Sequence, residues 1–210
     1  MTIDEYVKKH IDEEPALLKQ LKRDTHVKLL HPRMVSGHLQ GRLLKMLVQM
    51  ICPLNVLELG TYTGYSALCM AEGLEQAGAM IHTVEIDDEM GDFIRNYFEK
   101  SEYGDRIRLY IGDATEVIPS FDDAFFDLVF IDADKRRYWD YFESVLPKLR
   151  KGGFVIADNT LWSEKILEQP ASNDWQTKGV LEFNEKLKDD DRVEKVILPI
   201  RDGLTLIRKK

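Results

Sequence analysis

The sequence is poor in cysteine, since Cys52 and Cys69 are the only two in 210 residues and they form no CxxC pair. Disulfide frameworks and zinc sites need clusters of cysteine, or of cysteine with histidine, so both are disfavoured. Each cysteine lies in an apolar stretch with helical spacing. We therefore expect both thiols to be reduced and buried in the protein interior.

Long hydrophobic runs are also missing, and no stretch approaches the ~18 consecutive apolar residues that a membrane-spanning helix requires. Residues 1–15 carry charges throughout and contain no apolar segment like that of a signal peptide. We therefore expect neither membrane insertion nor export, and we predict a cytoplasmic protein.

Positive charge is in deficit: 29 Lys and Arg stand against 37 Asp and Glu, which gives a formal net charge of -8. An acidic total disfavours a broad nucleic-acid surface, although a local basic patch is compatible with it. The hydrophobic content of 44% and the charged content of 31% lie in the ordinary range of globular proteins. The composition therefore predicts a folded protein.

No internal repeat, low-complexity tract or Gly/Ser-rich linker divides the chain. The length suits one hydrophobic core better than two, so we predict a single domain over residues 1–210. Its first part, residues 1–52, is predicted to be helical because apolar residues recur there at helical spacing. These residues are Ile3, Tyr6, Val7, Ile11, Leu17, Leu18, Leu21, Leu39, Leu43, Leu44, Leu47 and Val48.

From residue 53 onward, short apolar and β-branched runs alternate with helix-like stretches. The run Leu-Val-Phe-Ile-Asp at residues 128–132 is apolar almost throughout, which is typical of parallel strands covered on both faces. The predicted strands are Asn55–Gly60, Ile81–Ile86, Ile107–Ile111, Phe126–Asp132 and Phe154–Asp158, and the predicted helices are Tyr65–Gln76, Asp88–Lys100, Tyr138–Leu149 and a stretch around Val180–Leu187.

Two further runs, Val193–Ile200 and Leu204–Ile207, flank a turn at Asp202 and Gly203. So short a connection can only join antiparallel strands, because a parallel pair needs a crossover of about a dozen residues or more. The predicted fold class is therefore α/β, with a doubly wound, mostly parallel seven-stranded sheet. It has a C-terminal antiparallel hairpin, helices on both faces and an N-terminal helical extension.

Three successive predicted strands end in residues that suit a nucleoside ligand. Residues 58–64 after the first strand read E-x-G-x-x-x-G, which is neither the G-x-G-x-x-G of dinucleotide binders nor a phosphate loop. Glu85 at the end of the second strand can accept hydrogen bonds from ribose hydroxyls, and residues 112–114 after the third can lie beside an adenine. Each piece alone could be an ordinary turn residue or a solvated acid. Together they predict a nucleoside-type ligand without a pyrophosphate.

The fourth and fifth strands end in acids: Asp132 and Asp134 follow one, and Asp158 and Asn159 follow the other. Such oxygen ligands suit Mg²⁺, Mn²⁺ or Ca²⁺, with water or substrate oxygens completing the shell. The alternative is that these acids only start helices or loops. Lys135 could be a solvated surface lysine, but beside a cation and buried it is a candidate general base.

These motifs resemble those of the cation-dependent S-adenosylmethionine O-methyltransferases related to catechol O-methyltransferase and caffeoyl-CoA O-methyltransferase. They keep their order over roughly residues 34–209, and the pair FIDADK and ADNTLW is specific to the metal-dependent branch. The resemblance implies a Rossmann-like core over residues 53–210. It rests on the segments VLELGTYTGYSAL, TVEID, GDA, FDLVFIDADKRRYWDY, GGFVIADNTLW and LPIRDGLTLIRK.

The resemblance implies methyl transfer from S-adenosylmethionine to one oxygen of a vicinal hydroxyl pair in a small catechol-like phenol. It implies that Lys135 is the catalytic base and that Asp132, Asp158 and Asn159 bind the metal, with magnesium expected and manganese or calcium as alternatives. The residues implied for the methyl donor site are Met34, Glu58, Gly60, Thr61, Tyr62, Ser66, Glu85, Asp113, Ala114 and the backbone of Asp132.

The acceptor is less well defined, because Ser163 follows Trp162 where caffeoyl-CoA enzymes typically have Asn. Residues 163–176 also lack the usual glycine and valine, so we expect a different acceptor-binding loop. Three other functions stay open: a tRNA hydroxyuridine O-methyltransferase, a non-catalytic S-adenosylmethionine-binding module, and a dehydrogenase. The acidic charge disfavours the first and the missing G-x-G-x-x-G disfavours the last. The resemblance also predicts a homodimer.

Overall fold

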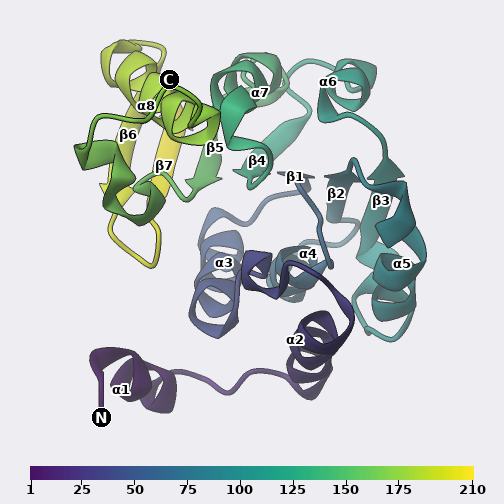
Figure 1. Ribbon diagram of the computed structural model, residues 1–210. Helices are drawn as coiled ribbons and strands as arrows, with labels where there is room; N and C mark the ends of the chain where they lie inside the picture. Colours follow the sequence, from purple (N-terminus) through teal and green to yellow (C-terminus); the bar gives the residue numbers. More distant parts are fainter.

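A seven-stranded sheet forms the centre of the computed structural model shown in Figure 1, which describes residues 1–210 apart from the side chain of Asp4. The strand order is β3-β2-β1-β4-β5-β7-β6, so the predicted seven-stranded sheet is confirmed. The strands are β1 (Asn55–Leu59), β2 (Met80–Glu85), β3 (Ile107–Ile111), β4 (Phe126–Ile131), β5 (Leu149–Asp158), β6 (Val193–Leu198) and β7 (Leu204–Lys209).

The strands β1 to β5 run parallel, whereas β7 is antiparallel to both of its neighbours, β5 and β6. β1 and β4 are buried on both faces, which explains their nearly continuous apolar sequences. The short connection after Leu198 forces β6 and β7 into an antiparallel hairpin. The predicted α/β fold class is therefore confirmed.

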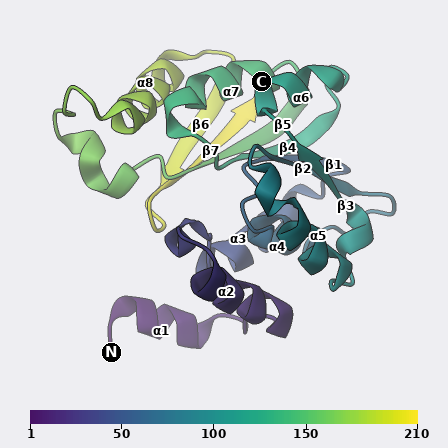
Figure 2. The ribbon, with the colours of Figure 1, turned by 45° about the vertical axis from the view of Figure 1, so that its right-hand side comes forward.

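Helices cover both faces of the sheet, with α3, α4 and α5 on one face and α6, α7 and α8 on the other (Figure 2). Each face has its own apolar core, with Leu44 and Met70 in the first and Phe142 and Phe183 in the second. The sheet is thus the middle of three layers. The helices are α1 (Ile3–His10), α2 (Ala16–Lys28), α3 (His38–Ile51), α4 (Tyr65–Glu72), α5 (Gly91–Glu99), α6 (Ala114–Val117), α7 (Tyr138–Val145) and α8 (Trp175–Asp189).

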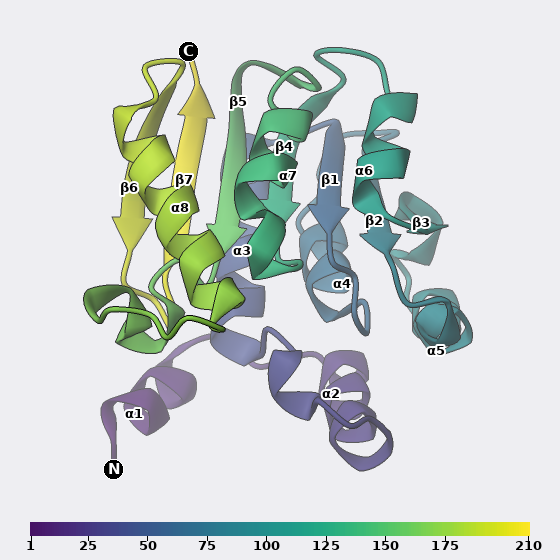
Figure 3. The ribbon, with the colours of Figure 1, turned by 45° about the horizontal axis from the view of Figure 1, so that its top comes forward.

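The helices α1 and α2 lie beyond the carboxyl ends of the parallel strands, as Figure 3 shows. α1 begins at a capping box, in which Thr2 and Glu5 each accept a hydrogen bond from the other's backbone N–H. None of the helices in the described residues combines the length and the apolar composition needed to cross a bilayer. Short 3₁₀ turns complete the structure: η1 (Pro32–Met34), η2 (Asp88–Met90), η3 (Gly104–Arg106), η4 (Ile118–Ser120), η5 (Lys135–Arg137) and η6 (Trp162–Leu167).

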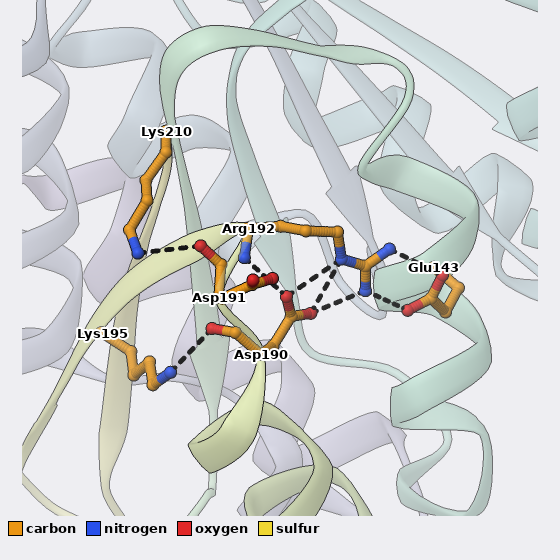
Figure 4. A network of polar contacts seen from close by, with 6 residues as sticks. All are labelled: Glu143, Asp190, Asp191, Arg192, Lys195 and Lys210. Carbon is orange, nitrogen blue, oxygen red and sulfur yellow. Dashed lines mark hydrogen bonds and ion pairs between the residues drawn. The ribbon is translucent and has the colours of Figure 1, made fainter.

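Arg192 joins α7, the end of α8 and the start of β6 (Figure 4). Its guanidinium pairs with Glu143 on α7 and with Asp190, with 2.6 Å between Arg192 Nη2 and Asp190 Oδ2. Lys195 Nζ donates to the main-chain oxygen of Asp190 at 2.9 Å. The Asp190 side chain is only 5% exposed, so its ion pair with Arg192 is largely shielded from solvent. Through Arg192, the outer end of the sheet is fixed to the helical layer.

Two local predictions are wrong. The helix predicted over Tyr138–Leu149 ends at Val145, and β5 already begins at Leu149, which pairs with Phe126. The register shifts between the pairs Phe126–Leu149 and Leu128–Phe154, so β5 contains extra residues there and continues through Gly152, whose φ is +76°. Gly152 and Gly153, which follow the predicted helix in the sequence, therefore lie inside a strand.

Cys52 is exposed, so its predicted burial is also wrong, whereas Cys69 on α4 is buried as expected. Cys52 caps α3 with a φ of +51° and donates its N–H to the carbonyl of Val48. The apolar helical pattern thus ends one residue too early to bury this thiol.

Candidate active site

A cavity of about 880 Å³ opens at the carboxyl edge of the parallel strands. Ligands of doubly wound sheets bind in this crevice. Residues 30–36 before α3 and the tip of the β6–β7 hairpin close the cavity from the other side. Most residues predicted for the donor, metal and base roles line it: Met34, Gly60, Thr61, Tyr62, Ser66, Glu85, Ala114, Asp132, Lys135, Asp158 and Asn159.

The turn between β1 and α4 packs tightly against the end of β4. Gly60 has a φ of +94°, and a Cβ atom there would lie 2.1 Å from the carbonyl oxygen of Asp132. A Cβ at Gly64 would lie 2.5 Å from the ring of Phe98. Both glycines are therefore required by packing, in addition to any role in ligand binding. The close approach fixes the backbone of Asp132 beside the turn.

Glu85 at the end of β2 holds the neighbouring turns with its two carboxylate oxygens. Tyr62 N donates to Oε2 at 2.6 Å, and Asp87 N donates to Oε1 at 3.0 Å. Burial raises the pKa of Glu85, and these backbone N–H groups oppose the rise. Each carboxylate oxygen has a second lone pair. Glu85 can therefore accept hydrogen bonds from two hydroxyl groups of a ligand in the cavity.

Two of the predicted donor-site residues, Glu58 and Asp113, do not line the cavity. Glu58 is fully buried on β1, and its Oε1 has no hydrogen-bond partner among the described residues. Burial raises the pKa of Glu58 to about 8. The carboxylate of Asp113 caps α6 by accepting from Thr115 N and pairs with Arg137 at 2.8 Å. Contacts of either residue with a methyl donor stay predictions.

Lys135 begins η5, and its side chain is buried between two polar groups. Its Nζ donates to Asp132 Oδ1 at 2.8 Å and to the Tyr138 hydroxyl at 2.5 Å. The Tyr138 hydroxyl donates in turn to the main-chain oxygen of Asp158 at 3.0 Å. Burial raises the pKa of Tyr138 well above 10, so its phenol stays protonated. Tyr138 therefore holds the Lys135 amine in the cavity wall.

Asp158 ends β5 with 3% of its surface exposed. Gln40 Nε2 donates to Oδ2 at 2.6 Å, and Asn159 N donates to Oδ1 at 2.7 Å. Arg201 Nη1 donates to Gln40 Oε1 at 2.8 Å, which fixes the orientation of the amide. Burial raises the pKa of Asp158, and the negative charge of Asp132 adds to this rise. Two carboxylates thus repel each other in the same buried corner.

Oxygen donors alone make up the candidate metal-binding set, with two carboxylates from Asp132 and Asp158 and one amide from Asn159. Among the side chains that the structure describes, no group of three or more His, Cys, Asp or Glu is placed to hold a metal ion. In the predicted ligand set, the third protein ligand is the amide of Asn159. Oxygen donors match a hard divalent cation, which would also offset the repulsion between the buried carboxylates. The residues present fit such a cation.

The third acid that follows these two strands, Asp134, has a different role. Asp134 accepts a hydrogen bond from Arg136 N and pairs with the Arg136 guanidinium at 2.5 Å. Asp134 therefore starts η5, as the alternative interpretation of these acids proposed. Arg136 is therefore a second basic residue beside these acids, in addition to Lys135.

Sequence reasoning did not identify Gln40, Tyr138 or Arg201 as site residues. Gln40 did carry a signal, since it lies on the same buried helical stripe of α3 as Leu44 and Val48. A polar side chain on such a stripe needs a buried hydrogen-bond partner. Tyr138 had no comparable signal, because an aromatic residue on a buried helical face is usually part of the core.

The family model described as O-methyltransferase matches residues 8–210 of the chain. Caffeoyl-CoA O-methyltransferase from Petroselinum crispum is 33% identical, over 93% of this chain and 85% of its own length. The SAH-bound methyltransferase PaMTH1 from Podospora anserina is 30% identical, with a TM-score of 0.90 over 99% of this chain and 94% of its own. An O-methyltransferase from Bacillus cereus in complex with SAH is 27% identical, with a TM-score of 0.87 over 99% of this chain and 97% of its own.

Proposed function

Since this chain belongs to the S-adenosylmethionine-dependent O-methyltransferase family that includes the caffeoyl-CoA enzymes, we propose that it methylates one oxygen of a vicinal hydroxyl pair in a small catechol-like phenol, with the help of a divalent cation. The observation that carries the proposal is the single cavity shared by Glu85, Lys135 and the oxygen donors of Asp132, Asp158 and Asn159. One cavity thus contains a group that can bind a nucleoside, a candidate general base and oxygen donors that can bind a cation.

The donor site is supported by two similar structures that contain SAH. In this proposal Glu85 accepts hydrogen bonds from the ribose hydroxyls, and Ala114 lies beside the adenine. The turn with Gly60, Thr61, Tyr62 and Ser66 surrounds the rest of the donor, and Met34 covers its methionyl end. All of these residues line the cavity.

The cation is proposed to be magnesium, with manganese or calcium as alternatives, and Asp132, Asp158 and Asn159 as its protein ligands. When bound, a divalent cation lowers the pKa of a coordinated hydroxyl and stabilises the oxyanion that forms. A cation held by these three ligands would have further coordination positions, which two neighbouring oxygens of an acceptor could fill. A vicinal diol carries two such neighbouring oxygens, and this is the reason to propose it as the acceptor.

Lys135 is proposed as the base. Its Nζ lies 2.8 Å from Asp132 Oδ1, so base and metal ligand occupy the same corner of the cavity. The proton of one acceptor hydroxyl passes to Nζ, and the electron pair of the oxygen forms the new O–C bond. The C–S bond of the sulfonium breaks and leaves a neutral thioether. Positioning both reactants in one cavity contributes several kcal/mol, roughly, to lowering the barrier.

The proposal is tested by methyl transfer from labelled S-adenosylmethionine to catechol, in Mg²⁺ and in EDTA. Catechol is expected to be methylated only with the cation. Phenol, which has one hydroxyl group, is the matched acceptor and is expected to stay unmethylated. Full activity in EDTA would contradict the role of the cation. Caffeoyl-CoA and tRNA serve as further acceptors. Methylation of tRNA alone would show that the acceptor is a hydroxyuridine and not a catechol, an alternative that none of the comparisons favours.

A homodimer and a cytoplasmic location stay predictions. The mass of the protein in solution at micromolar concentration tests the first, and a monomer would contradict it.

A further inference from the structure

A second cavity of about 390 Å³ lies between α1, α2 and the start of α3. It adjoins the main cavity, because Pro32, Arg33, Val35, Ser36 and Arg201 line both. Among the side chains that the structure describes, no acid lines the second cavity, although the chain carries 37 Asp and Glu against 29 Lys and Arg. Six of its lining residues are basic in type: Lys8, Lys22, His26, Arg33, His38 and Arg201.

Three cations of this second cavity, Lys22, Arg33 and Arg201, are poorly neutralised by the residues that the structure describes. Lys22 Nζ lies 4.0 Å from Glu14 Oε1, and that oxygen already accepts a hydrogen bond from the Tyr65 hydroxyl at 2.5 Å. The guanidinium of Arg33 is exposed and has no hydrogen bond or ion pair within the described part of the chain. Arg201 uses one N–H on the neutral amide of Gln40. Several donors are therefore available to a ligand.

The two cavities differ in their acids. The main cavity is lined by the acids Glu85, Asp132, Asp134, Asp158 and Asp202 together with five Lys and Arg, whereas the described side chains of the second cavity are all basic or neutral. Arg201 lies at the junction, where the single amide of Gln40 separates its guanidinium from the Asp158 carboxylate. A molecule that reaches from Asp158 into the second cavity therefore passes from oxygen donors to cations within a short distance.

We propose that the second cavity is a binding site for an anionic group, carboxylate or phosphate, on the methyl acceptor. The inference rests on the proposed function, since it places the diol of the same acceptor beside Asp158 and Lys135. The acceptor class is then an acidic catechol, with its negative group held by Arg33, Lys22 and Arg201. Partly exposed ion pairs each contribute up to about 1 kcal/mol, so the preference arises from several cations together.

The test compares caffeate with methyl caffeate, which differ in one charge, and adds a catechol phosphomonoester to separate carboxylate from phosphate. The readout is the ratio of kcat/KM for the charged acceptor to that for the ester. The ratio is expected to exceed about 10 in the original protein. In each of the single variants Arg33→Gln and Lys22→Gln it is expected to fall about fivefold, because each variant loses one ion pair. Arg23→Gln, an exposed arginine on α2 outside both cavities, is the matched control and is expected to keep the ratio.

Calorimetric binding of caffeate and methyl caffeate without a methyl donor gives the same comparison in the absence of turnover. If neither acceptor is methylated but the binding preference for caffeate is lost in Arg33→Gln, the site stands and the proposed reaction fails. Equal binding of acid and ester, unchanged in both variants, overturns the inference and leaves the reaction untouched. Salt at 0.5 M, roughly a tenfold excess over low-salt buffer, should weaken the preference for caffeate, because exposed ion pairs are screened. A preference that is unchanged in this salt would also contradict the proposed anion site.

Discussion

The amide of Gln40 on α3 donates a hydrogen bond of 2.6 Å to the carboxylate of Asp158 at the end of β5. Both residues are buried, and the N-terminal helical part thereby supports an acid of the candidate metal site. Groups that hold a metal ligand in place typically contribute 10- to 100-fold, roughly, to metal affinity. Gln40 therefore acts on the site through Asp158.

The substitution Gln40→Leu keeps the size of the side chain and removes this donor. We expect the affinity for Mg²⁺ to fall by at least about tenfold, because Asp158 Oδ2 loses the bond that orients it. Binding of Tb³⁺, followed by its luminescence, measures this without turnover. Gln49→Leu on the same helix is the control, since Gln49 bonds only to the exposed Glu75 at 3.3 Å. Equal affinities in the two variants would contradict the role of Gln40.

Lys135→Met removes the proposed base and retains most of the side-chain volume. We expect kcat to fall by roughly 10²-fold or more, the usual contribution of a general base. Affinity for S-adenosylmethionine is expected to change little, because Lys135 is not among the residues proposed to hold the donor. Rapid-quench turnover and calorimetry separate the two effects. Lys186→Met, at an exposed lysine of α8 paired with Glu182, is the control.

Gly60→Ala and Gly78→Ala form a matched pair, with φ angles of +94° and +79°. A positive φ costs a residue with a Cβ roughly 1–2 kcal/mol. Gly78 has no atom within 4 Å of the added Cβ, whereas at Gly60 the Asp132 carbonyl oxygen would lie at 2.1 Å. We expect Gly78→Ala to lower the free energy of unfolding by this amount and Gly60→Ala by clearly more. Urea unfolding measures both, and equal losses would show that the close approach to Asp132 is relaxed at little cost.

Arg192→Gln is expected to lower the free energy of unfolding by roughly 1–2 kcal/mol at neutral pH, because the nearly inaccessible Asp190 carboxylate loses a charged donor. The Arg192 hydrogen bond lowers the pKa of Asp190 below its ordinary value of 3.8. A depressed folded pKa stabilises the fold above that value, and the gain disappears as the pH falls through the folded pKa. The difference between the original protein and the variant should therefore shrink below about pH 4. A constant difference down to pH 2, roughly the lower limit of such titrations, would contradict this assignment.

Periodicity predicted the elements of the fold well because it reports burial directly. The buried strands β1 and β4 are apolar almost throughout, and the short connection at Asp202 and Gly203 permits only an antiparallel hairpin. The start of β5 was missed because Arg150 and Lys151 are exposed at the end of the sheet. There the strand is defined by pairing of Leu149 with Phe126, a long-range contact that a local pattern does not contain.

Site residues at strand ends were predictable for a related reason. Parallel strands bring their carboxyl ends to one edge, so Glu85, Asp132 and Asp158 were expected together and they line one cavity. Gln40 and Arg201 join that edge through tertiary packing of the N-terminal helices and the hairpin tip, which strand order does not specify. Asp113 also follows a strand and was predicted for the donor site, but it does not line the cavity. Its carboxylate instead caps α6 and pairs with Arg137.

The hydrogen bond between Arg201 and Gln40 joins residues 161 positions apart in the chain. During translation, the early helices leave the ribosome long before the hairpin that orients Gln40 has been synthesised. The nascent polypeptide thus has no completed Asp158 support until residue 201 has emerged. A chain that has been synthesised only as far as residue 200 therefore lacks the hydrogen bond that orients Gln40 toward the candidate metal site.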